Sequence, residues 1–174
     1  MRYSKLQKLL KNRTLILLLV FSFTILKYSN VNTFNIDETT VENCIEMMQL
    51  AELFSIGNVK NAVNRFILRN FDRLITNDQY KKLTFEQMKF FLQSNKLKLY
   101  PEIRVFKACV AWLRSYTEQP ASEIALELFQ NIRFNTMKPE EFVDIVTKEM
   151  LIKNDPKCAG LLIEAYEYFA LPNR

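Results

Sequence analysis

Residues 39–71, TTVENCIEMMQLAELFSIGNVKNAVNRFILRNF, decide the fold. Apolar side chains recur three or four positions apart on both sides of SIGN at residues 55–58, which is the spacing of helices with one buried face. Thr39 and Glu42 have the spacing of a capping box, which predicts a helix start, and Gly57 suits a helix end or a tight turn. Because the link is so short, the two helices are predicted to pack as an antiparallel hairpin.

Helical spacing continues along the rest of the chain. Thr84 and Gln87 form a second capping-box pattern, and Pro139 stands where a helix can begin. Two Gly and five Pro in 174 residues are too few for a protein with many tight turns, and no strand-type alternation persists. The sequence therefore predicts an all-α fold, an array of antiparallel helical hairpins with about seven to eight helices of uneven length.

Residues 1–36 form a separate, basic and apolar leader. They hold six basic side chains and no acidic one, and their apolar run covers residues 14–26. This run is shorter than the roughly 20 apolar residues that a membrane-spanning helix needs. Three interpretations stay open: a signal or membrane anchor, a helix that packs on the body, and a leader outside the fold. Residues 37–174 are predicted to form one helical domain.

The composition argues against an enzyme. The chain has no His, which removes the commonest general base and every His-bearing metal site. Its two glycines, Gly57 and Gly160, are too far apart to build a phosphate-binding loop. Cys44, Cys109 and Cys158 lie among apolar residues without a CxxC pair, so they are predicted to be buried, reduced thiols. We expect no catalytic residue, no cofactor and no metal site.

The net charge of +5 is concentrated in the leader. Of the 24 basic side chains six lie in residues 1–36, which leaves 18 basic against 19 acidic side chains in residues 37–174. A nearly neutral body predicts no binding of nucleic acid through a broad basic face.

Three segments follow one another in the order and spacing of one known family. They are VENCIEMMQLAELFSIGNV (41–59), LTFEQMKFFLQSNKLKLYPEIRVFKACVAWL (83–113) and LFQNIRFNTMKPEEFVDIVTKEMLIKNDPKCAGLLIEAYEYFALPNR (128–174). Together they resemble the BACK domain of the BTB–BACK–kelch (kelch-like) proteins. The resemblance implies an isolated BACK module, without the BTB domain or the kelch propeller, and leaves two interpretations open, a solitary module and a fragment of a longer protein.

Kelch-like proteins are typically substrate adaptors of cullin-3 ubiquitin ligases. The resemblance therefore implies a non-catalytic, cytoplasmic interaction or scaffold module, similar to the spacer of these adaptors. The first helix pair of the family, the 3-box, extends the cullin-binding surface and corresponds to residues 41–71. The candidate contact residues are Leu50, Leu53, Phe54, Val59 and Val63. An alternative is that these side chains form the hairpin core.

The expected partners are the cullin-3 scaffold, with weak or absent binding in the absence of a BTB domain, and kelch-like relatives. The alternative function is that of an unrelated, membrane-associated helical protein tethered by residues 14–26.

Two aromatic features complete the predictions. Trp112 is predicted to anchor the core. The cluster of Tyr166, Tyr168 and Phe169 is predicted to leave an apolar patch exposed near the C-terminus, with self-association as the consequence.

Overall fold

The computed structural model describes residues 39–53, 55–116 and 122–171. The chain divides into two units, Met1–Glu38 and Thr39–Arg174, and every described residue belongs to the second. The interpretations of the leader, including an anchor at residues 14–26, therefore lie outside the described residues. Within the described ranges, no helix combines the length and the apolar character needed to cross a membrane.

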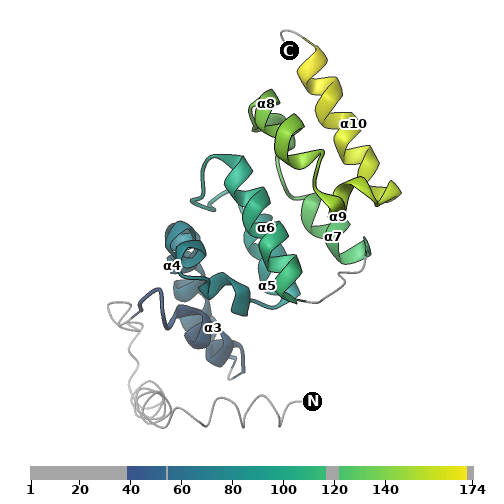
Figure 1. Cartoon of the computed structure of the whole chain (residues 1–174). Coiled ribbons are helices and arrows are strands. Elements are labelled where there is room, and N and C mark those ends of the chain that lie inside the picture. Colours follow the sequence, from purple (N-terminus) through teal and green to yellow (C-terminus); the bar gives the residue numbers. More distant parts are fainter. Residues whose placement is uncertain (1–38, 54, 117–121, 172–174) are drawn as a thin grey trace, which may run out of the picture. The chain divides into compact units, whose positions relative to one another are not determined.

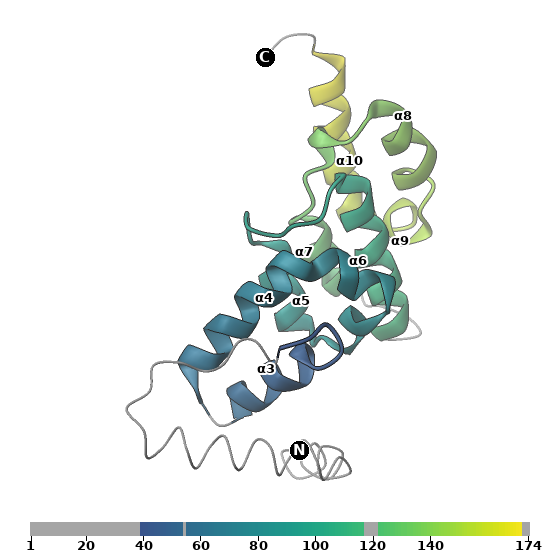
Figure 2. The same ribbon diagram turned by 90° about the vertical axis from the view of Figure 1, so that its left-hand side faces the viewer.

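The described part of the chain is built from helices and turns, which confirms the predicted all-α fold (Figure 1). It holds eight α-helices, two 3₁₀ helices and one π-helix. In both views α3 and α10 lie at opposite ends of the array (Figures 1 and 2). The elements are α3 (Cys44–Leu53), α4 (Gly57–Thr76), η2 (Gln79–Lys82), α5 (Phe85–Leu92), α6 (Glu102–Tyr116), α7 (Ser122–Phe129), η3 (Phe134–Thr136), α8 (Pro139–Glu141), the π-helix η4 (Phe142–Val146), α9 (Met150–Lys153) and α10 (Pro156–Ala170).

The first two helices pack together as the predicted hairpin. At the link, the Ile56 N–H donates to the Ala51 carbonyl at 2.8 Å, which ends α3. The left-handed residue of the link is Ser55, with a φ of 58°. The prediction that Gly57 makes the turn was wrong, because Gly57 is the first residue of α4.

The two capping-box patterns have different outcomes. The Thr84 hydroxyl accepts from the Gln87 N–H at 3.3 Å and the Gln87 side chain accepts from the Thr84 N–H at 3.0 Å, so the second capping box is confirmed. The first prediction was wrong, because α3 starts only at Cys44. There, the Asn43 side chain accepts from the Thr40 N–H at 2.8 Å, and the buried Thr39 hydroxyl has no hydrogen-bond partner among the described residues.

Trp112 is fully buried and anchors the core, as predicted. Its indole Nε1–H donates to the Leu83 carbonyl at 3.2 Å, which ties α6 to the loop before α5. This bond uses the only polar atom of the side chain, so the burial of Trp112 leaves no unpaired donor.

Aromatic rings join the second half of the array. Phe106 on α6 lies 5.7 Å from Phe129 and 6.0 Å from Phe134, measured between ring centroids. Phe142 continues the series, 6.0 Å from Phe134 and 5.3 Å from Phe169 on α10. Tilted and edge-on rings at these distances attract one another in addition to burying apolar area, so they fix α10 against the preceding elements.

A buried carboxylate secures the turn after α7. Glu102, at the start of α6, accepts from the Arg133 backbone N–H at 3.0 Å. The Arg133 guanidinium lies 3.8 Å from the same carboxylate. The buried charge is thus both hydrogen-bonded and paired, which is the arrangement that makes its burial tolerable.

Candidate functional site

The five predicted contact residues do not share one environment. Val59 and Val63 are buried in the core of the α3–α4 hairpin, where the alternative interpretation placed them. Leu50 is half-buried, while the Leu53 side chain at the end of α3 is 41% exposed. Phe54 lies outside the described residues. Among the four described residues, only Leu50 and Leu53 can therefore touch a partner while the hairpin stays closed.

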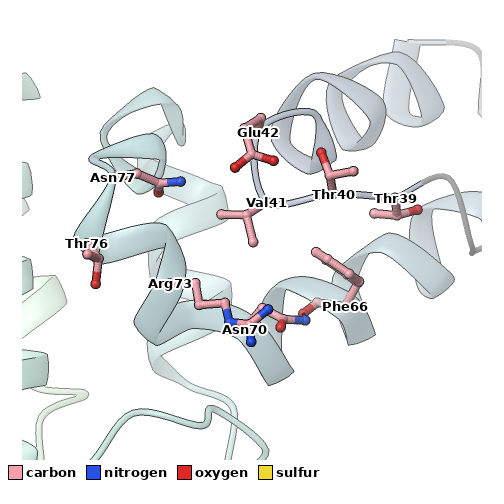
Figure 3. A pocket seen from close by; sticks show the side chains of 9 residues that line it. All are labelled: Thr39, Thr40, Val41, Glu42, Phe66, Asn70, Arg73, Thr76 and Asn77. Atoms are coloured by element: carbon pink, nitrogen blue, oxygen red, sulfur yellow. Dashed lines mark hydrogen bonds between the residues drawn. The ribbon is translucent and has the colours of Figure 1, made fainter.

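A groove opens at the other end of the hairpin because its helices differ in length. α3 has 10 residues and α4 has 20, so α3 cannot cover all of α4. The segment before α3 runs past the second half of α4, and between them lies a groove of about 530 Å³ (Figure 3). We call it the α4 groove. Its lining residues are Thr39, Thr40, Val41, Glu42, Phe66, Asn70, Arg73, Thr76 and Asn77.

A kink in α4 shapes the floor of this groove. Asn70 leaves helical geometry, with a φ of −113° and a ψ of 17°. Its side-chain Nδ2 donates to the Phe66 carbonyl at 2.9 Å, so that the carbonyl keeps a partner beside the kink. An Asn can make this local bond and a Leu cannot, which explains a polar residue at this position.

One cationic side chain, Arg73, lines the groove, and two more arginines precede it on the exposed side of α4. Arg65, Arg69 and Arg73 are exposed and four positions apart, so they neighbour one another along α4. No carboxylate of the described residues pairs with them, since Asp72 on the same helix pairs with Arg104 instead. Arg73 is thus the only one of the three arginines that could meet a carboxylate or phosphate group bound in the groove, and Arg65 and Arg69 face solvent.

The buried thiols carry no sign of reactivity. Burial raises the pKa of Cys44 to about 11 and is the largest cause that raises the pKa of Cys158 to about 12. Burial also raises the pKa of Cys109 well above its ordinary value. A reactive thiol has a lowered pKa, so these three behave as small apolar side chains. In the ranges that the structure describes, no three metal-ligating side chains gather at one place.

The sequence analysis missed the α4 groove, although it contained a signal for it. Phe66, Asn70, Arg73 and Asn77 recur at steps of four, three and four, which puts them on one side of α4. Along this side the residues change from the apolar Phe66 to the polar Asn70, Arg73 and Asn77. The change occurs where the shorter α3 no longer covers α4. Such a change marks the point where a helix stops being covered by its neighbour.

The comparisons with known proteins identify the family. A family model described as BACK, BTB And C-terminal Kelch, matches residues 44–147. The chain belongs to the BACK family. The BACK match begins at the first residue of α3 and includes the whole hairpin.

Kelch-like proteins are among the relatives of the chain. Kelch-like protein 13 of Homo sapiens is 37% identical over 139 residues, which are 80% of this BACK chain and 21% of that protein. Kelch-like protein 9 of Mus musculus is also 37% identical, with 80% and 22% of the two chains covered. Kelch-like protein 26 of Danio rerio is 34% identical over 135 residues, 78% of this chain and 22% of that protein. The chain thus spans about a fifth of the length of these relatives.

Proposed function

We propose that this BACK chain is a non-catalytic, cytoplasmic protein-binding module of the kind that serves as the spacer of cullin-3 ubiquitin ligase adaptors. The proposal is supported by the family match over the α3–α4 hairpin together with the exposure of Leu53 at its tip. An exposed Leu is by itself ordinary, but here it lies at the position that corresponds to the cullin-contacting helix pair of the family.

Of the four described candidate residues, only two belong to the proposed contact surface. Leu50 and Leu53 would touch the scaffold, whereas Val59 and Val63 would act only by holding α4 against α3. Two aliphatic side chains supply little buried area compared with the roughly 800 Å² per partner of a stable interface. We therefore expect binding of a cullin-3 scaffold by this chain alone to be weak, and kelch-like relatives remain further candidate partners.

Weak binding calls for a site-resolved measurement. We would titrate the isotope-labelled chain with the N-terminal region of cullin-3 and follow its amide signals by NMR. The expected result is a set of shifts at α3 and the start of α4, with little change in α10 at the far end of the array (Figure 1). Shifts confined to other helices, or none at millimolar scaffold, would contradict the proposal.

A matched pair of variants tests the residues. Leu53→Asp is expected to weaken the interaction at least about five-fold, because it charges an apolar contact. Met150→Asp is the control, since Met150 on α9 is 58% exposed and lies outside the hairpin. It should leave the titration unchanged, and both variants should keep the helical circular dichroism of the parent chain. Equal binding by Leu53→Asp and the parent would remove Leu53 from the contact surface.

A further inference from the structure

The last helix of the described part exposes an unusual amount of apolar surface. In α10 only Cys158 and Ala165 are buried. The Ile163 side chain is 57% exposed and the Tyr166 side chain 45% exposed. The exposed residues of α10 are Pro156, Lys157, Ala159, Gly160, Ile163, Glu164, Tyr166, Glu167, Tyr168 and Ala170, of which three carry a charge. This bears out the expected apolar patch near the C-terminus.

The helix α4 shows what a solvent face looks like in the same chain. After Gly57 at its first position, its exposed residues are all polar or charged: Asn58, Asn61, Arg65, Arg69, Asp72, Arg73 and Thr76. A helix face that meets water is expected to be polar in this way. The outer face of α10 therefore lacks the composition of a helix face that meets water.

The apolar residues of this face form a seam. Ala159, Ile163, Tyr166 and Ala170 follow one another at steps of four, three and four, the spacing of residues that pack along the contact of two helices. We call them the α10 seam. Large side chains, Ile163 and Tyr166, occupy its middle, and small ones occupy its ends.

Gly160 lies beside the seam on the exposed face of α10. A glycine inside a helix destabilises it relative to alanine. Yet an added Cβ at Gly160 would meet no atom within 4 Å, and the backbone there does not take a positive φ. Neither packing nor backbone conformation within a single copy therefore requires a glycine at this position, next to Ala159.

We propose that the α10 seam binds the α10 seam of a second copy of this chain in antiparallel orientation, with the two-fold axis close to Ile163. This orientation puts Tyr166 of each copy over Ala159 of the other, so that a large side chain meets a small one. A two-fold contact needs only one self-complementary surface, and the seam supplies it.

The charges along α10 favour the same orientation. Lys157 lies near the start of the exposed face, whereas Glu164 and Glu167 lie in its second half. An antiparallel pair brings Lys157 of one copy toward Glu167 of the other, twice in the dimer, whereas a parallel pair places like charges side by side. Among the described residues Lys157 pairs with Glu123 at 3.3 Å, an exposed contact that a better partner can replace.

The expected dimer is weak and reversible. A helix of 15 residues is about 22 Å long, so its one face buries less area than a standard interface. We expect dissociation constants of tens of micromolar or weaker. The α3–α4 hairpin lies at the opposite end of the array and stays accessible to a partner in this dimer (Figure 2). The dimer contact is therefore independent of the function proposed above.

Sedimentation velocity of the full chain over a wide concentration range tests the dimer. We expect a monomer–dimer equilibrium that Ile163→Glu shifts at least ten-fold toward monomer, because the two introduced carboxylates would face each other across the two-fold axis without a compensating charge. Leu53→Glu is the matched control, an exposed aliphatic residue given the same charge at the far end, and should dimerise like the parent. A parent chain that stays monomeric, or an Ile163→Glu variant that associates as the parent does, overturns the proposal.

Two further variants test the orientation. Ile163→Cys should form disulfide-linked dimers on mild oxidation, because residues at a two-fold axis come within bonding distance, while Arg69→Cys on the solvent face of α4 should not. Lys157→Glu should weaken the dimer about five-fold, and Lys157→Glu combined with Glu167→Lys should restore it. Failure of both the cross-link and the restoration would exclude the antiparallel arrangement.

Discussion

At the scale of single residues, one hydrogen bond distinguishes Trp112 from an ordinary core residue. Its indole donates to the Leu83 carbonyl across 29 positions of sequence, and both residues are buried. The spacing of apolar residues predicted that Trp112 faces the core, because spacing reports which side of a helix is buried. It could not predict the carbonyl, because that partner comes from another element and becomes a neighbour only after folding.

Replacing Trp112 with Phe should therefore cost more than the change in ring size suggests. Trp112→Phe removes the donor and leaves the Leu83 carbonyl buried without it, which costs about 1–3 kcal/mol in addition to the smaller ring. Urea unfolding followed by circular dichroism measures the loss. Tyr116→Phe is the control, since Tyr116 is exposed and should change stability by less than about 0.5 kcal/mol. Equal stabilities of the two variants would show that the bond contributes nothing.

At the scale of elements, two similar motifs start helices differently. Thr84 and Gln87 cap α5 reciprocally, whereas Thr39 lies five positions before the first residue of α3 and its hydroxyl has no partner among the described residues. Both motifs have the same spacing, so the sequence alone predicted the same structure for each. The difference is local: Asn43 accepts from the Thr40 N–H, so the side chain that caps this end of α3 comes from Asn43 and the Thr39–Glu42 pair is not used.

The difference between the motifs can be measured by a pair of substitutions. Thr84→Ala should destabilise the protein by about 1 kcal/mol, because it leaves the Gln87 N–H without its acceptor. Thr39→Val should cost nothing or add slightly to stability, because it replaces a buried, unpaired hydroxyl with a methyl group of the same shape. Differential scanning calorimetry measures the stability of both variants. An equal loss of stability in both would refute the assignment of the cap to Thr84.

The helices themselves were the most predictable elements. Apolar patterns of helix length predicted α4 and α6, and the capping box predicted the start of α5. The π-helix η4 was not foreseen, since its wider turn leaves no distinct spacing in five residues. Among the predicted contact residues, Leu53 is exposed and Val59 is buried. Sequence spacing could not distinguish the two, because both are apolar residues at helical spacing.

At the scale of the whole molecule, the buried thiols are expected to lower the free energy of unfolding at alkaline pH. Cys44, Cys109 and Cys158 are spread over three helices, and burial raises the pKa of each above its ordinary value of 9.0. Below about pH 9 the thiols are protonated in both the folded and the unfolded chain, so they have no effect. Above this value the unfolded thiols ionise first, and the free energy of unfolding falls as the pH rises toward the folded pKa values.

Removing one thiol should weaken this pH dependence. Between about pH 8 and pH 10, the parent chain should lose about 1.4 kcal/mol more of its unfolding free energy than Cys109→Ala, because one ionising group is gone. Urea midpoints at the two pH values measure the difference. Ser115→Ala on the same helix has no titrating group and should show the full loss of the parent. An identical pH dependence in Cys109→Ala would show that Cys109 ionises equally well in the folded chain.

The sparse burial of α10 also has a kinetic consequence. With only Cys158 and Ala165 buried, α10 has far fewer core residues to release than α6, which buries nine. Local opening of a segment becomes more frequent as its buried contact decreases, so α10 is expected to open more often than α6 despite its ring contacts with Phe142. The amide hydrogens of α10 should then exchange with solvent well before those of α6. A contact that covered α10 would slow this exchange and so register as added local protection, without any change in the core.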